Sequence, residues 1–268
     1  MSENEKEISI DTKHSGIMHS HDIDFIIHGA DMQFVEMSLD PGEVVVGETG
    51  AMMFMDDGIG MSTKMSDGSE KNSGIFGSLM GAAKRSLTGE KFFMTFFTNQ
   101  GHRKARLAFA APYPGMIIPI ELDKIGTPVL CQKEGFLCGT KGISIGLGFT
   151  KRIGAGLFGG EGYILQKLEG NGVAFIHSGG AILERNLGVG QKISVDTGSL
   201  VAFQASVDFD IKMVRGFSNM VFGGEDLFLT ELTGPGKVWI QSMPYPRLVL
   251  NIRNTLFKMD TGKEKKGQ

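Results

Sequence analysis

Three glutamates at matching positions in the sequence are the first candidates for chemistry. Glu90, Glu161 and Glu225 each follow a glycine and precede a short, mainly apolar run. Two carboxyl groups can perform general acid–base catalysis when different environments separate their pKa values. Acids copied to equivalent positions would instead share one environment. We therefore interpret these three as parts of a repeated structural motif and assign no catalytic residue.

A second set of acids supports the same interpretation. Glu48, Glu134 and Asp196 each lie in a strand-like run and are followed within two residues by a glycine. The segment 39–50 matches 187–198 residue by residue, and the stretch 126–139 is a shorter, more divergent copy. Such self-similarity indicates a repeated supersecondary unit. These acids are therefore also predicted to have structural roles.

Histidines near the N-terminus raise the possibility of a metal site. His19 and His21, two residues apart, would project on one face of a strand, with Asp24 and His28 close by. This pair is similar to the His-x-His of cupin metal sites, but the glutamate expected shortly after it is absent. Further histidines that could complete a site are His102 and His177. We assign no metal-binding residue.

The glycines at 154, 156 and 159 spell the G-x-G-x-x-G pattern of dinucleotide-binding loops. That interpretation requires a helix directly after the loop, whereas a strand-like run follows here. We therefore predict no cofactor. Basic and acidic residues are nearly balanced, at 27 and 30, so charge predicts no nucleic-acid partner.

Two cysteines, Cys131 and Cys138, allow two interpretations. If Glu134 and Gly135 form a two-residue hairpin turn, the cysteines lie opposite each other on paired strands. The alternative is two reduced core residues in a cytosolic protein. The six-residue spacing between them matches no known metal or redox motif.

Alternating apolar residues and 39 glycines predict an all-β fold of many short strands. A helix is predicted only over 74–87, where apolar residues recur at helical spacing. Such a helix could cap an open barrel end or a subunit contact, and the alternative is a membrane surface. No apolar run reaches the roughly 20 residues needed to span a bilayer, and the polar start is unlike a signal peptide.

The repeats predict the organisation of the chain. A flexible tail is expected over 1–20, followed by a first β repeat over 21–104 that contains the helix 74–87. The second and third repeats are predicted over 105–178 and 179–250. A C-terminal tail is expected over 251–268.

Several segments resemble the altered inheritance of mitochondria 24 family, over a match from about His21 to Met243. They are Asp31–Glu36, Leu87–Thr95, Pro112–Gly115, Gly159–Gly170, Phe222–Glu225 and Leu232–Trp239. The resemblance implies three tandem, pseudo-threefold double-stranded β-helix or jelly-roll-like repeats, similar to the tryptophan RNA-binding attenuation protein. It also implies a homo-oligomer, with a trimer favoured, and no established activity. A distant eukaryotic branch is mitochondrial.

We therefore expect a non-enzymatic oligomeric scaffold or interaction protein in the cytoplasm, with a possible membrane or protein partner. An alternative is a small-molecule-binding module that holds its ligand between repeats or subunits. A cupin-like metal-dependent enzyme is a more distant alternative. Sequence-specific RNA binding is not expected, because the basic residues are scattered.

Overall fold

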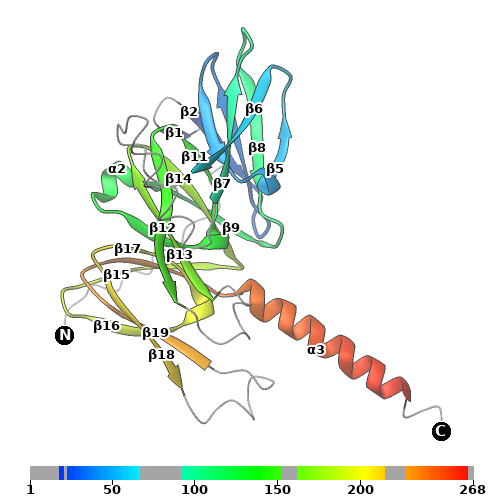
Figure 1. Ribbon diagram of the computed structural model, residues 1–268, viewed down its shortest axis with the longest axis vertical. Helices are drawn as coiled ribbons and strands as arrows, with labels where there is room; N and C mark the ends of the chain where they lie inside the picture. The colour runs from blue at the N-terminus through cyan, green and yellow to red at the C-terminus, as the bar shows by residue number, and fades with distance from the viewer. Residues whose placement is uncertain (1–17, 21–22, 67–91, 152–161, 215–226, 265–268) are drawn as a thin grey trace. The chain divides into compact units, whose positions relative to one another are not determined.

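The computed structural model describes residues 18–20, 23–66, 92–151, 162–214 and 227–264. Strands dominate these residues, as predicted, and the protein is all-β (Figure 1). The predicted helix 74–87, the glycine pattern at 154–159, His21 and the three glutamates Glu90, Glu161 and Glu225 lie outside the described residues.

The chain divides into two compact units, which we describe separately. In the described part of the chain, the first unit comprises 18–150 and 164–177, and the second comprises mainly 178–264.

Two sheets form most of the first unit. One has the strand order β1-β2-β3-β8-β5. Its strands are β1 (Met18–Ser20), β2 (Ile23–His28), β3 (Phe34–Leu39), β8 (Ala105–Ala110) and β5 (Met52–Met55). The other has the order β6-β7-β4-β11-β14-β9. Its strands are β6 (Ile59–Ser66), β7 (Phe92–Asn99), β4 (Val44–Gly47), β11 (Phe136–Thr140), β14 (Val173–Gly179) and β9 (Gly115–Glu121).

Three further strands of this unit lie side by side in the order β12-β13-β10. They are β12 (Ile143–Lys151), β13 (Tyr163–Gly170) and β10 (Val129–Gln132). A single helical turn, α2 (Leu122–Ile125), follows β9 and ends at Gly126, whose backbone is left-handed.

The second unit contains two groups of three strands. One has the order β17-β20-β15, and the other has the order β16-β19-β18. The strands are β15 (Ile182–Leu187), β16 (Lys192–Asp196), β17 (Leu200–Gln204), β18 (Asp208–Val214), β19 (Leu227–Thr233) and β20 (Gly236–Gln241). A 20-residue helix, α3 (Tyr245–Glu264), follows β20.

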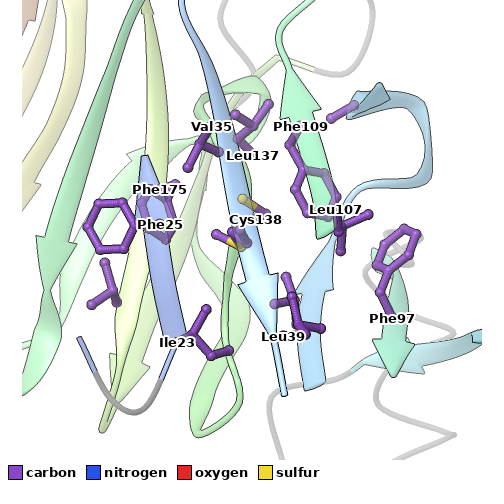
Figure 2. Packing of buried hydrophobic residues seen from close by; sticks show 14 of the residues in the cluster. Ile23, Phe25, Val35, Leu39, Phe97, Leu107, Phe109, Leu137, Cys138 and Phe175 are labelled. Carbon is purple, nitrogen blue, oxygen red and sulfur yellow. The ribbon is translucent and has the colours of Figure 1, made fainter. Parts of the chain in front are cut away.

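The core of the first unit follows from the period-2 pattern of its strands. Along β3, Val35, Met37 and Leu39 are fully buried, while the residues between them are only partly buried. Figure 2 shows Val35 and Leu39 among buried side chains of neighbouring strands, including Phe25, Phe109 and Phe175. The rings of Phe25 and Phe175 meet edge-to-face with centroids 4.8 Å apart. Burying each large apolar side chain stabilises the fold by about 1.5–3 kcal/mol.

The acid–glycine segments form corners at which one strand ends and another begins. Short 3₁₀ turns occur at Thr49–Ala51, Lys133–Gly135 and Thr197–Ser199. The first carries the chain from β4, in the six-stranded sheet, to β5, at the edge of the five-stranded sheet. The third carries it from β16, which pairs with β19, to β17, which pairs with β20. These glycines therefore mark sheet-to-sheet corners.

Each corner is followed by the same irregularity. The pairing register shifts between Met52 and Phe54 on β5, between Phe136 and Cys138 on β11, and between Leu200 and Ala202 on β17. A β-bulge of this kind bends a strand and increases its local twist. In each of the three segments, a 3₁₀ turn is thus followed by a β-bulge in the next strand.

Of the two interpretations of the cysteines, the hairpin at Glu134 and Gly135 does not hold. β10 pairs with β13, and β11 pairs with β4 and β14, so the two cysteines do not face each other across paired strands. The reason is that Lys133–Gly135 forms a 3₁₀ turn, which directs the chain to a different partner strand. Cys131 and Cys138 are both buried and free, in agreement with the alternative interpretation.

The helix α3 is also not predicted by the sequence analysis, which treats 251–268 as a tail. Its first turn contains Pro246, and proline favours this position because its fixed backbone angle suits a helix and its missing N–H is not needed there. The amide of Leu248 donates a hydrogen bond of 3.1 Å to the carbonyl of Pro244.

Candidate functional site

Two of the predicted structural acids, Glu48 and Glu134, come close enough for their charges to interact. Glu48 directly follows β4, and its amide donates a hydrogen bond of 3.2 Å to the carbonyl of Leu137. Glu134 lies in the 3₁₀ turn that precedes β11. The pairing of β4 with β11 brings these two corners together.

The environment of Glu48 favours its neutral form. The pKa of Glu48 is raised from 4.5 to about 7, mainly by burial and also by the nearby charge of Glu134. Lys133 acts in the opposite direction and lowers the pKa of Glu48. A carboxyl with a pKa near 7 can gain or lose a proton at neutral pH, as general acids and bases do.

A buried thiol lies beside this carboxyl. Burial raises the pKa of Cys131, and the charge of Glu48 raises it further. Its Sγ donates a weak hydrogen bond of 4.0 Å to Oε1 of Gln166, a residue that is itself almost completely buried. The nucleophilic form of cysteine is the thiolate. Cys131 therefore stays protonated at neutral pH and is not activated as a nucleophile.

Together these groups form a proton-sensitive cluster that runs from the exposed Glu134 and the partly buried Glu48 to the buried Cys131 and Gln166. We call these four residues the acid cluster. Both acids belong to corners of the fold, and the thiol is held in its inactive form. The arrangement can take up or release a proton at the cost of fold stability. The acid cluster does not combine an activated nucleophile with a neighbouring general base.

The third acid of this set, Asp196, has different partners. One of its oxygens accepts hydrogen bonds from the amides of Gly198 and Ser199, at 2.9 and 3.2 Å. The other forms an ion pair with Arg247 of α3. Asp196 thus stabilises the turn that follows it and links the start of α3 to the end of β16.

The histidines predicted as metal candidates are spread over the first unit. His19 lies opposite Asp24 in the β1–β2 pairing. His28 stacks on Phe34, and its Nε2 lies 3.5 Å from Glu36. His102 is exposed. Among the residues that the structure describes, no group of three or more histidines, cysteines or acids is arranged to hold a metal ion.

His177, near the end of β14, is the most unusual of the histidines. It is buried, and its ring meets that of Tyr113 edge-to-face at 4.7 Å. Neither ring nitrogen has a hydrogen-bond partner within the described part of the chain. Burial lowers the pKa of His177 to about 4, so it is neutral at pH 7.

The surface offers a different kind of candidate, because large apolar residues are exposed on strands at sheet edges. Met53 and Met55 lie on β5, the outer strand of the five-stranded sheet, and Met61 lies on β6, the outer strand of the six-stranded sheet. No residue of β5 is charged. Charged residues normally protect exposed sheet edges from pairing with other chains. We call residues 52–55 of β5 and 59–63 of β6 the methionine edge.

The family model described as "Mitochondrial biogenesis AIM24" matches residues 25–243. The chain belongs to this family. The match begins within β2 and ends directly before α3, so it covers the strands of both units except β1.

Two relatives come from Streptococcus pyogenes. An uncharacterized protein of serotype M6 is 32% identical over 216 residues, which are 79% of this chain and 83% of the relative. The X-ray crystal structure of another protein of that species superposes with a TM-score of 0.66 at 21% identity. The likeness covers 87% of this chain and 99% of the streptococcal chain, and it shows that the two share a fold.

The acids Glu48 and Glu134 can be recognised in the sequence, but the effect of burial on the pKa of Glu48 cannot. His177 is recognisable there only as a possible metal ligand, and the methionine edge was not predicted. The sequence does contain a signal for that edge, because the uncharged run Met52–Met55 is directly followed by Asp56 and Asp57. In the described part of the chain, no helix is long and apolar enough to cross a membrane.

Proposed function

We propose that this protein is a self-assembling scaffold without enzymatic activity, built by contacts between several copies of the chain. The observation that supports this proposal is the methionine edge. An uncharged outer strand with exposed apolar residues is prone to pair with another strand. A ring of subunits removes such open edges. The family resemblance favours a trimer, and the composition and polar start of the sequence favour the cytoplasm as its location.

The proposed architecture consists of three tandem jelly-roll-like repeats around a pseudo-threefold axis. It is supported by the three corners, each with an acid, a 3₁₀ turn and a register shift in the next strand. Repeat units of this size cannot bury a core alone and are stabilised by their neighbours.

The mass of the protein in solution tests the assembly. Sedimentation equilibrium of the wild type is expected to give three times the 29.0 kDa mass of one chain. Replacing both edge methionines, Met53→Lys with Met55→Lys, should lower that mass, because two charges would then oppose strand pairing. Met32→Lys is a matched control, since Met32 is exposed but lies outside the edge strands. A wild type that stays monomeric at all concentrations would contradict the proposal.

A second candidate function is the binding of a small molecule inside the first unit. It is favoured by His177, whose buried ring nitrogens have no partner within the described residues. Buried polar groups are normally hydrogen-bonded, so an exception can mark a water or ligand site. Native mass spectrometry of the purified protein tests this candidate. A retained small molecule that is lost in His177→Phe would support it, and two spectra without added mass would contradict it.

A further inference from the structure

Three methionines of the methionine edge are open to solvent, unlike the methionines of the core. The exposed fractions of Met53, Met55 and Met61 are 55%, 38% and 42%. Met37 and Met94, by contrast, are 0% and 2% exposed. A methionine that solvent reaches is also reached by oxidants dissolved in it. Its thioether then becomes a sulfoxide, which is polar and can be reduced again.

Methionine is an unusual choice for the strand β5. Strands favour β-branched and aromatic residues. The inner strand β4 follows this preference with Val44, Val45 and Val46, whereas β5 consists of three methionines and one phenylalanine. Valine or isoleucine could make the same apolar contacts at this edge. Methionine adds a property that those residues lack, which is reversible oxidation.

Two of the three methionines lie beside residues of the core. In the antiparallel pairing, Met55 is opposite Leu107 of β8, and Met61 is opposite Phe97 of β7. Opposite residues of paired strands project from the same face of a sheet. Leu107 and Phe97 are fully buried in the core cluster of the first unit. Met55 and Met61 therefore extend the apolar interior to the outer strands, where solvent reaches them.

We propose that Met53, Met55 and Met61 are sites of reversible oxidation that controls assembly of the protein. This inference rests on the proposed self-assembly through the methionine edge and adds its regulation. The oxidant is a hydroperoxide, which transfers one oxygen atom to the methionine sulfur. The O–O bond breaks, the sulfur–oxygen bond forms, and the peroxide leaves as an alcohol, or as water if it is hydrogen peroxide. Sulfur loses two electrons and the peroxide gains them.

The reverse step requires a dithiol reductant, as supplied by methionine sulfoxide reductases. Two thiols become one disulfide, the sulfoxide oxygen leaves as water, and the thioether is restored. Only the free chain exposes these sulfur atoms, because a second copy paired at the edge would cover them. Oxidation therefore acts on the free chain and keeps it from pairing.

The sulfoxide opposes pairing because its oxygen is a hydrogen-bond acceptor on a formerly apolar side chain. In a contact between two strands, this oxygen would be removed from water without a donor to bind it, which is unfavourable. A methionine offers an adaptable apolar contact in its reduced form only. The same three positions thus support association when reduced and oppose it when oxidised.

Two other exposed methionines provide internal controls. Met32 lies between β2 and β3, and Met213 lies on β18, the outer strand of a three-stranded sheet in the second unit. That strand also carries Asp208, Asp210 and Lys212, which oppose pairing with another chain. Oxidation of Met32 and Met213 is therefore expected without any effect on assembly.

The test combines oxidation by hydrogen peroxide with peptide mass spectrometry and sedimentation equilibrium of the full chain. As sulfoxide forms at Met53, Met55 and Met61, the sedimentation mass should fall about threefold, to the 29.0 kDa of one chain. Methionine sulfoxide reductase with a dithiol should restore the original mass. The triple variant Met53→Leu, Met55→Leu, Met61→Leu should keep its mass in peroxide, although Met32 and Met213 become oxidised in it.

The leucine variant also excludes a reaction of thiols, because it retains Cys131 and Cys138. An equal loss of mass in this variant would overturn the proposal. So would an unchanged mass of the wild type after its three edge methionines are oxidised, which would leave the scaffold itself intact. The oxidised wild type should still unfold cooperatively on heating. Loss of that transition would mean that oxidation acts on the fold, and a wild type that is monomeric before oxidation would overturn both the switch and the scaffold.

Discussion

At the scale of single residues, two buried groups give the stability of this protein opposite dependences on pH. Glu48 has a raised pKa, so the folded state binds its proton more tightly than the unfolded chain. His177 has a lowered pKa, so the unfolded chain binds its proton more tightly. Between about pH 4.5 and 6.5 the two effects oppose each other. The pH dependence that one group gives to the stability is therefore clear only in a variant that lacks the other group.

Glu48→Gln should remove a contribution to stability that decreases as pH rises. Between pH 4.5 and 7 the folded wild type holds a proton at Glu48 that the unfolded chain releases, so this group lowers the free energy of unfolding as pH rises, whereas His177 raises it up to about pH 6.5. The full shift corresponds to about 3 kcal/mol. Urea unfolding at pH 5 and pH 8 measures it. A variant that loses as much stability as the wild type between these pH values would contradict the assignment.

His177→Phe should remove a loss of stability that occurs as pH falls. The lowered pKa stabilises the fold fully above pH 6.5, and this contribution disappears as pH approaches 4. The full shift corresponds to roughly 3 kcal/mol. Thermal unfolding between pH 7 and pH 4 gives the slope, and the exposed His102→Phe serves as the control. If the unfolding temperature changes with pH in the same way in both variants, His177 does not cause the loss of stability at low pH.

The sequence could predict that Glu48 and Glu134 are structural, because their positions repeat. It could not predict their mutual repulsion, since that depends on the pairing of β4 with β11. The pKa of His177 depends in the same way on burial, which no local pattern reveals. Residue types and spacing identify candidate functional residues, whereas the surroundings of each residue in the folded structure determine its protonation.

At the scale of elements, the corners and their close strand contacts determine how the sheets pack. Gly47 ends β4 where the six-stranded sheet approaches the aromatic side chains of the five-stranded sheet. A Cβ at Gly47 would lie 2.6 Å from Cε1 of Phe109 and 3.2 Å from Cβ of Cys138. Both distances are shorter than normal contacts, so the neighbouring side chains would have to move.

Gly47→Ala should therefore destabilise the fold by about 1–3 kcal/mol, the usual cost of overpacking a core. Gly50→Ala is a matched control three residues later, because a Cβ there would meet no atom within 4 Å. Chemical denaturation of both variants at one pH makes the comparison. Equal stabilities would mean that the contact with Phe109 relaxes without cost.

The alternation of apolar residues was sufficient to predict strands, for example Phe34–Leu39 on β3. It was not sufficient to predict the corners, because a strand that turns into another sheet keeps the same alternation. The helix α3 was missed because the charged and polar residues of its second half, toward the C-terminus, are typical of a flexible tail. The hairpin interpretation does not hold because Glu134 and Gly135 suit a 3₁₀ turn as well as a hairpin loop.

At the scale of the whole molecule, the shared fold and the helix α3 are separable in sequence. The family match covers 25–243, and the streptococcal structure confirms the fold at low identity.

Truncation after Leu248 should leave the β fold intact, because it keeps Arg247 and its ion pair with Asp196. Cooperative thermal unfolding within a few degrees of the full-length midpoint is expected, since the removed residues that the structure describes are mostly exposed. Circular dichroism with a temperature ramp measures the midpoint. A truncated chain that unfolds without a cooperative transition would show that α3 is part of the folding unit.

The burial of both cysteines gives the protein an internal reporter of its own opening. Cys131 and Cys138 both lie in the first unit and are fully enclosed. A maleimide dye can react with them only when that unit transiently unfolds. The labelling rate therefore measures the opening equilibrium of this unit alone. If copies of the chain associate, their separation would leave that rate unchanged, so one reagent can distinguish dissociation from denaturation.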